Sequence, residues 1–196
     1  MRIKISNQPL ILCVFLLFIC LNSCKDTSTP RPYGYFRVDL PPHQYVASNF
    51  ENFPYSFDIS KIAITESPAQ QNEKYWIDIK YPSLNASIYC SYKPVNSNLF
   101  ELTEDTRKIV YKHTVKAENI AEIPYENAEQ KVYGILYELT GNTASPVQFV
   151  LTDSNKNFFR GALYFENVPN KDSIAPIVQY VQKDIVRLIE SFEWKN

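Results

Sequence analysis

The sequence predicts an α+β domain built on a single antiparallel sheet of about six or seven strands, with two helices packed on it. Three observations predict this fold. Segments with strand patterns and segments with helix patterns follow in the order strands, helix, strands, helix. Most connections between the predicted strands have hairpin length, which favours antiparallel neighbours. Both predicted helices carry an apolar stripe of the kind that packs on a sheet.

The first predicted strands precede residue 75. An aromatic and apolar run predicts a strand at Tyr33–Leu40, and Pro41–Pro42 ends it because proline cannot donate to a sheet ladder. Two further strands are predicted at Tyr55–Ile59 and Lys61–Thr65, and a polar loop at Glu66–Lys74 follows them.

The next segment has the pattern of a hairpin. Tyr75–Tyr81 (YWIDIKY) alternates over most of its length, which places Ile77 and Ile79 on one face of a strand. Turn residues at Pro82–Asn85 follow, and Ala86–Tyr92 (ASIYCSY) again has a strand pattern. We therefore predict an antiparallel pair.

The first helix is predicted at Asn98–Lys116. Acidic residues lie early in this segment and basic residues lie late, which matches the helix dipole. Six residues at helical spacing form one stripe: Leu99, Leu102, Thr106, Ile109, Val110 and His113.

Three more strands are predicted at Lys131–Leu139, Pro146–Thr152 and Asn157–Phe165. The first two are joined by a turn at Gly141–Asn142, and the last two by a turn at Asp153–Lys156.

The last predicted element is an amphipathic helix. Asp172 or Ser173 can cap it, and Pro176 falls in its first turn, where a missing N–H costs little. Its apolar stripe consists of Ile174, Ile177, Val178, Val181, Ile185, Leu188, Ile189 and Phe192. The whole arrangement resembles the PsbP-type sandwich.

The N-terminus has the parts of a bacterial lipoprotein signal. Arg2 and Lys4 form a short positive region, and Leu10–Leu21 (LILCVFLLFICL) follows without a charge. That run is too short for a comfortable membrane span, which needs about 18 to 20 apolar residues. Residues 21–24 (LNSC) resemble the lipobox, in which the cysteine is lipidated and the chain is cut before it. An uncleaved anchor or a buried helix is the alternative.

We therefore predict residues 1–23 as a lipoprotein signal peptide, 24–32 as a tether lipidated at Cys24, and 33–196 as a single α+β domain. Removing the signal peptide removes two bases and no acid, which changes the formal net charge from −1 to −3. Such a mixed, mildly acidic chain gives no electrostatic reason for nucleic-acid binding.

Cysteine usage excludes an intrachain disulfide in the processed protein. Of the four cysteines, Cys13 and Cys20 leave with the signal peptide and Cys24 is predicted to carry lipid, so Cys90 remains alone. Cys90 lies in an apolar strand pattern, which favours a buried small hydrophobic residue over a nucleophile.

The sequence offers no conventional catalytic or metal site, so we predict no enzyme activity, cofactor or metal. The domain has two histidines, His43 and His113, and lacks metal-binding Cys and His spacings, a phosphate-binding glycine loop and a nucleophile elbow. His113 closes the apolar stripe of the first helix, where a half-buried histidine bonded to a carbonyl is the simpler interpretation. Asp153 and Arg160 flank a predicted turn and suit turn capping and pairing at a strand end.

Several stretches in collinear order resemble the gliding-motility lipoprotein family GldD, and they span nearly the whole domain. They are residues 35–41 (YFRVDLP), 86–94 (ASIYCSYKP), 98–117 (NLFELTEDTRKIVYKHTVKA), 131–137 (KVYGILY) and 144–176 (ASPVQFVLTDSNKNFFRGALYFENVPNKDSIAP). The resemblance implies an accessory lipoprotein of the gliding machinery and the associated type IX secretion system, with no assigned catalysis, cofactor or metal. It also implies other machinery proteins as partners, and a membrane anchor that faces the periplasm. The outer membrane is favoured over the inner membrane, and surface exposure stays open.

Three functions remain open from the residues. The first, which we favour, is an assembly lipoprotein that binds proteins through tyrosine and arginine side chains. Its candidate surface residues are Tyr35, Arg37, His113, Asp153 and Arg160. The second is a module that binds a small ligand or a lipid in an apolar pocket. The third is a hydrolase centred on His113.

Overall fold

A computed structural model describes residues 39–48, 50–68, 73–112, 116–166 and 171–195. The predicted signal peptide and tether lie outside the described residues, and so do Cys24, Tyr35, Arg37 and His113. Neither described helix is both long enough and apolar enough to cross a membrane.

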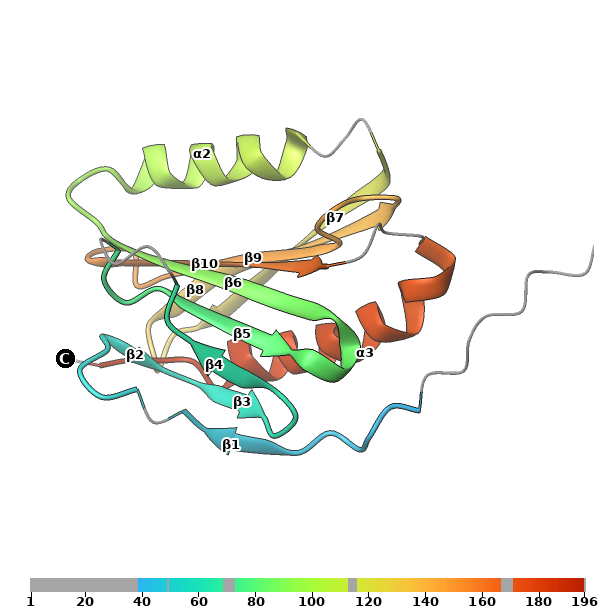
Figure 1. Ribbon diagram of the computed structural model, residues 1–196. Helices are drawn as coiled ribbons and strands as arrows, with labels where there is room; N and C mark the ends of the chain where they lie inside the picture. Colours follow the sequence, from blue (N-terminus) through green and yellow to red (C-terminus); the bar gives the residue numbers. More distant parts are fainter. Residues whose placement is uncertain (1–38, 49, 69–72, 113–115, 167–170, 196) are drawn as a thin grey trace, which may run out of the picture. The chain divides into compact units, whose positions relative to one another are not determined.

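The framework is one seven-stranded sheet in which every neighbouring pair is antiparallel (Figure 1). In spatial order its strands are β4 (Ile64–Glu66), β5 (Ile77–Tyr81), β6 (Ala86–Pro94), β10 (Asn157–Phe165), β9 (Val147–Thr152), β8 (Val132–Gly141) and β7 (Ala117–Asn127). The predicted fold class, α+β with a single antiparallel sheet and two helices, is confirmed.

The two helices lie on opposite faces of this sheet (Figure 1). α3 (Lys171–Glu190) buries its stripe against the larger core, which draws on β5, β6, β8, β9 and β10. α2 (Leu99–Tyr111) packs on a smaller cluster on the other face, where Val110 is fully buried. Side chains of one strand alternate between the two cores, as in Phe149 and Val150 of β9.

Two short ribbons complete the larger core on the α3 side. β1 (Tyr45–Ala47) pairs with β3 (Asp58–Ser60), and β2 (Tyr55–Ser56) pairs with β11 (Glu193–Trp194). Their aromatic side chains pack against those of the sheet and of the chain after α3, as in the edge-to-face contact between Tyr55 and Phe159, with centroids 4.7 Å apart.

The predicted hairpins are confirmed. β5 pairs with β6 with Ile79 opposite Ile88, and Ile77, Ile79 and Tyr81 are all buried. The turn between the two strands is a short 3-10 helix, η1 (Pro82–Leu84), which is followed by Asn85, whose φ of 49° is left-handed. β8, β9 and β10 form the predicted run of antiparallel strands.

Several predicted boundaries before β5 are wrong. The described end of the first predicted strand, residues 39 and 40, is not in a strand. The predicted strand Tyr55–Ile59 divides into β2 and β3, because its two ends pair with different partners. Only Ile64 and Thr65 of the predicted strand Lys61–Thr65 belong to β4.

The largest omission in the prediction is β7. This eleven-residue strand was not predicted, because its sequence (AENIAEIPYEN) is polar and contains Pro124. As the last strand of the sheet it has a partner on one side only, and an edge strand tolerates a proline. The predicted first helix accordingly ends early, at Tyr111.

The predicted start of the last helix is also wrong. α3 begins at Lys171, so Asp172 and Ser173 lie inside the helix rather than capping it, and Pro176 falls beyond the first turn. The apolar stripe explains why the helix tolerates this proline, since burial of Val181, Ile185 and Leu188 fixes α3 on the sheet irrespective of one missing N–H.

Candidate functional site

One part of the sheet face that carries α2 is exposed. The cluster under α2 draws on β8, β9 and the first residues of β10, whereas β4, β5 and β6 contribute nothing buried to it. On these strands Ile64 is 47% exposed and Tyr89 is 45% exposed. We call this surface the open face; its residues, which share one side of the sheet by register, are Ile64, Asp78, Lys80, Tyr89, Ser91, Arg160 and Tyr164.

Aromatic rings and charges lie together on the open face. The ring centroids of Tyr89 and Tyr164, on neighbouring strands, are 5.7 Å apart. Lys80 donates to Glu66 of the edge strand at 2.6 Å, so its charge is paired. Burial raises the pKa of the Asp78 carboxyl, an effect that Lys80 partly offsets.

Arg160 lies in the middle of β10 and is half-buried. It faces Ser91 on one side and Val150 on the other, so the predicted pairing at a strand end is wrong. Its guanidinium donates to Gln148 Oε1 at 2.8 Å, and its buried Nε has no partner in the described part of the chain. Burial lowers the pKa of this guanidinium, and Tyr164 partly offsets the effect.

Asp153 has the predicted role of holding a turn. Its Oδ1 accepts the backbone N–H groups of Asn155, Lys156 and Asn157 at 2.7–2.9 Å, and its Oδ2 accepts the Asn157 amide. Burial alone would raise the pKa of Asp153, but these hydrogen bonds outweigh it and lower the pKa. The structure does not bring Asp153 together with Arg160: Asp153 bonds residues of its own turn, whereas Arg160 bonds Gln148 in the middle of the sheet.

A buried carboxylate that sequence reasoning missed lies on the α3 side. Asp184 is 4% exposed and accepts hydrogen bonds from His43 Nδ1 at 2.7 Å, Tyr45 at 2.9 Å and Tyr81 at 3.1 Å. The His43 ring also stacks on Tyr180, with centroids 4.2 Å apart. Burial and the carboxylate raise the pKa of both Tyr45 and Tyr81, so these tyrosines are neutral donors.

This cluster fixes residues 39–48, which we call the strap, to α3. An acid in the apolar stripe, between Val181 and Ile185, was the signal in the sequence that could have shown a buried polar site. The bond to Asp184 occupies His43 Nδ1, and Tyr180 stacks on the ring. We therefore assign this cluster a structural role, which is to hold the strap on α3.

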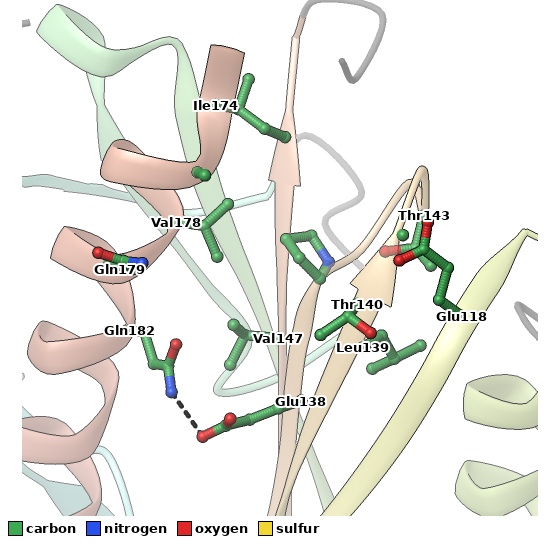
Figure 2. A pocket seen from close by; sticks show the side chains of 13 residues that line it. Glu118, Glu138, Leu139, Thr140, Thr143, Val147, Ile174, Val178, Gln179 and Gln182 are labelled. Carbon is green, nitrogen blue, oxygen red and sulfur yellow. Dashed lines mark hydrogen bonds between the residues drawn. The ribbon is translucent and has the colours of Figure 1, made fainter. Parts of the chain in front are cut away.

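A groove of about 340 Å³ opens beside α3, between its first turns and the ends of β7 and β8 (Figure 2). Ile174 and Val178 face Val147 across it, and a hydrogen bond from Gln182 to Glu138 closes one end. Its remaining lining residues are Glu118, Leu139, Thr140, Gly141, Thr143, Pro146, Ala175 and Gln179.

The described lining of the groove contains polar groups but no base. The hydroxyl of Thr143 is buried without a partner among the described residues. Two carboxylates, Glu118 and Glu138, line the groove, and among the described residues that line it none is Lys, Arg or His. Within the described residues no three His, Cys, Asp or Glu side chains are grouped to hold a metal ion, there or elsewhere.

Comparisons with known proteins show the family. The family model described as gliding motility lipoprotein GldD matches residues 25–194. Comparison with curated protein sequences found no relative. Among solved structures, the solution structure of cyanobacterial PsbP (CyanoP) from Synechocystis sp. PCC 6803 is similar with a TM-score of 0.48 and 11% identity, over 84% of this chain and 99% of that one. Because the family model spans nearly all of the sequence after Cys24, the chain belongs to the GldD family of gliding motility lipoproteins, which implies a membrane-anchored protein of gliding motility.

Proposed function

We propose that this lipoprotein is an accessory or assembly component of the gliding machinery and of the associated type IX secretion system, and that it acts through protein–protein contacts. It is anchored by acyl chains on Cys24, faces the periplasm and is held on the outer membrane. Its partners are other proteins of the machinery, including lipoproteins. This role requires neither catalysis nor a cofactor.

The observation that supports this proposal is the open face. The open face carries an arginine and two tyrosines whose rings contact each other, and this is the composition of a protein-binding surface. Tyr89 and Ile64 are too exposed to contribute to the core of this domain, so core packing does not account for their apolar side chains. Contact with a partner would bury them and contribute binding free energy.

Complementation of a deletion strain tests the proposal. The strain receives wild type, Cys24→Ala or Tyr89→Ser, and three quantities are measured: colony spreading, secretion of a type IX cargo protein, and co-purification of machinery proteins from membranes. We expect Cys24→Ala to lose membrane attachment and all three activities. We expect Tyr89→Ser to keep attachment and protein level but to lose co-purification and spreading.

Phe100→Ser is the matched control. Phe100 is 78% exposed at the start of α2 and lies outside the open face, so its loss should leave all three activities unchanged. Normal spreading, secretion and co-purification with Tyr89→Ser would contradict the proposal, and so would a loss seen only with Phe100→Ser.

The alternative function, binding of a small ligand or a lipid, has one observation in its favour. The groove beside α3 has the volume of a small binding site, and the unpartnered hydroxyl of Thr143 could bond a ligand. Its two carboxylates disfavour an anionic ligand such as a fatty acid. Val178→Trp would fill the groove. The alternative would be supported if this variant lost colony spreading while Tyr89→Ser spread normally.

A further inference from the structure

Arg160 is a half-buried cation with no counter-ion among the residues that the structure describes. No ion pair within the described residues includes it, although Lys80 of the same face is paired with Glu66. A charge withdrawn from water without an opposite charge destabilises the fold that holds it. The lowered pKa of Arg160 has this same cause. The isolated protein therefore carries a cost that an added anion would remove.

The guanidinium is fixed in place, as a binding group requires. Gln148 is fully buried between β8 and β10, and its amide oxygen accepts from Arg160 Nη2 at 2.8 Å. The amide nitrogen of Gln148 has no partner in the described part of the chain, nor does Arg160 Nε. Arg160 and Gln148 thus keep two buried N–H groups, at Arg160 Nε and Gln148 Nε2, that an acceptor from a partner could satisfy.

The surroundings of Arg160 favour a carboxylate on a protein. A phosphate site usually gathers several cations or backbone N–H groups. By register the exposed Lys93 lies diagonally beside Arg160 on this face, whereas Lys80 lies two strands away and is already paired, so Arg160 supplies the half-buried guanidinium there. Tyr164 lies two residues along β10 on the same face, and Tyr89 is in ring contact with it. Tyrosines around one arginine resemble the centre of a protein interface, where a single acidic side chain can bond the guanidinium through both oxygens.

We propose that Arg160 is the receptor for an aspartate or glutamate side chain of a partner protein that docks on the open face, with Tyr89 and Tyr164 packing beside it. This inference rests on the proposed function, because it names the chemistry of the contact that the open face makes. Asp78, on the same face, would repel a second acid, so the partner segment presents one carboxylate at Arg160 and no acid towards β5.

The premise is tested on the purified full-length lipoprotein in detergent. Arg160→Met combined with Gln148→Leu removes the charge, keeps much of the aliphatic stem of Arg160, and leaves no buried amide that has lost its bond to Arg160. If the cation is unpaired in the isolated protein, the unfolding midpoint of this variant is equal to or higher than that of wild type. A clearly lower midpoint would show that Arg160 is already satisfied within the chain, and would overturn the inference.

The contact is tested by crosslinking in cells. A photoreactive amino acid replaces Tyr89 in the full chain, and the crosslinked partner peptide is identified by mass spectrometry. We expect a peptide with an acidic residue near the crosslink. Arg160→Glu in the same chain should lower the crosslink yield by about tenfold or more, and changing the partner acid to lysine should restore it. The control Lys108→Glu reverses an exposed charge of α2, outside the open face, that is paired with Asp105, and it should change the yield little.

The outcomes separate this inference from the proposed function. A protein crosslink that Arg160→Glu leaves unchanged, or a partner peptide without an acid, overturns the role of Arg160 and leaves the open face as a protein-binding surface. A crosslink to phospholipid instead of protein overturns both. The absence of any protein crosslink at position 89, in a strain whose spreading is normal, also overturns both.

Discussion

Replacement of Asp184 by asparagine should destabilise the protein by about 3 kcal/mol. The carboxylate is almost fully buried and accepts three hydrogen bonds, from His43 and Tyr45 of the strap and from Tyr81 of β5. A hydrogen bond to a charged group contributes about 1.5–3 kcal/mol. Asparagine keeps the size and one acceptor oxygen but turns the other oxygen into a donor, so part of this sum is retained.

Urea unfolding of the purified protein measures this effect. The midpoint should fall while the slope with urea stays that of wild type, because the surface exposed on unfolding is unchanged. Asp58→Asn is the matched control. It removes a more exposed ion pair with Arg187 and should cost less than about 1 kcal/mol.

A double-mutant cycle tests whether His43 and Asp184 stabilise the fold through the same hydrogen bond. His43→Ala combined with Asp184→Asn should cost less than the sum of the two single changes, since both remove the same hydrogen bond. An Asp184→Asn protein within about 1 kcal/mol of wild type, no different from the control, would refute the inference that this carboxylate fixes the strap to α3.

Three further predictions concern the sheet and its turns. Gly161→Ala should destabilise by about 1–3 kcal/mol in the same urea experiment, because its Cβ would lie 2.3 Å from the buried ring of Phe149; unchanged stability would mean that this ring can move aside. Asp153→Asn should cost about 1 kcal/mol at neutral pH. Because the pKa of Asp153 is lowered in the folded protein, its ionised carboxylate stabilises the fold above the ordinary pKa of aspartate, and this stabilisation is lost as pH falls through the lowered pKa. A variant with the acid-unfolding profile of wild type would contradict this. Asp78→Asn should raise the thermal midpoint at neutral pH and lose that advantage in acid, because a raised pKa means that ionising Asp78 costs stability as pH rises; a lower midpoint at pH 7 would show that its charge is satisfied.

Local patterns were enough to predict the elements whose cause is local. The alternation around Ile77 and Ile79 predicted β5 because one face of that strand is buried. The long stripe around Val181 and Ile185 predicted α3 for the same reason at helical spacing. β7 escaped prediction because an edge strand buries little, so its sequence does not need an apolar alternation.

The candidate residues show the same division. Asp153 holds a turn through neighbours two to four residues away, and its role could be predicted from the sequence. Arg160 was singled out because it flanks a predicted turn, but its lack of a counter-ion among the described residues depends on which strands flank β10. No sequence pattern gives that neighbourhood.

The sequence by itself thus determined the α+β class, the hairpins, the amphipathic last helix and the resemblance to the GldD family, because periodicity, turn residues and collinear segments are properties of the chain. Only the tertiary structure decided that the two helices cover opposite faces, that part of one face stays open, and that His43 meets Asp184 across 141 residues of sequence. These features arise from contacts between distant segments, whose free energies depend on packing and burial in three dimensions.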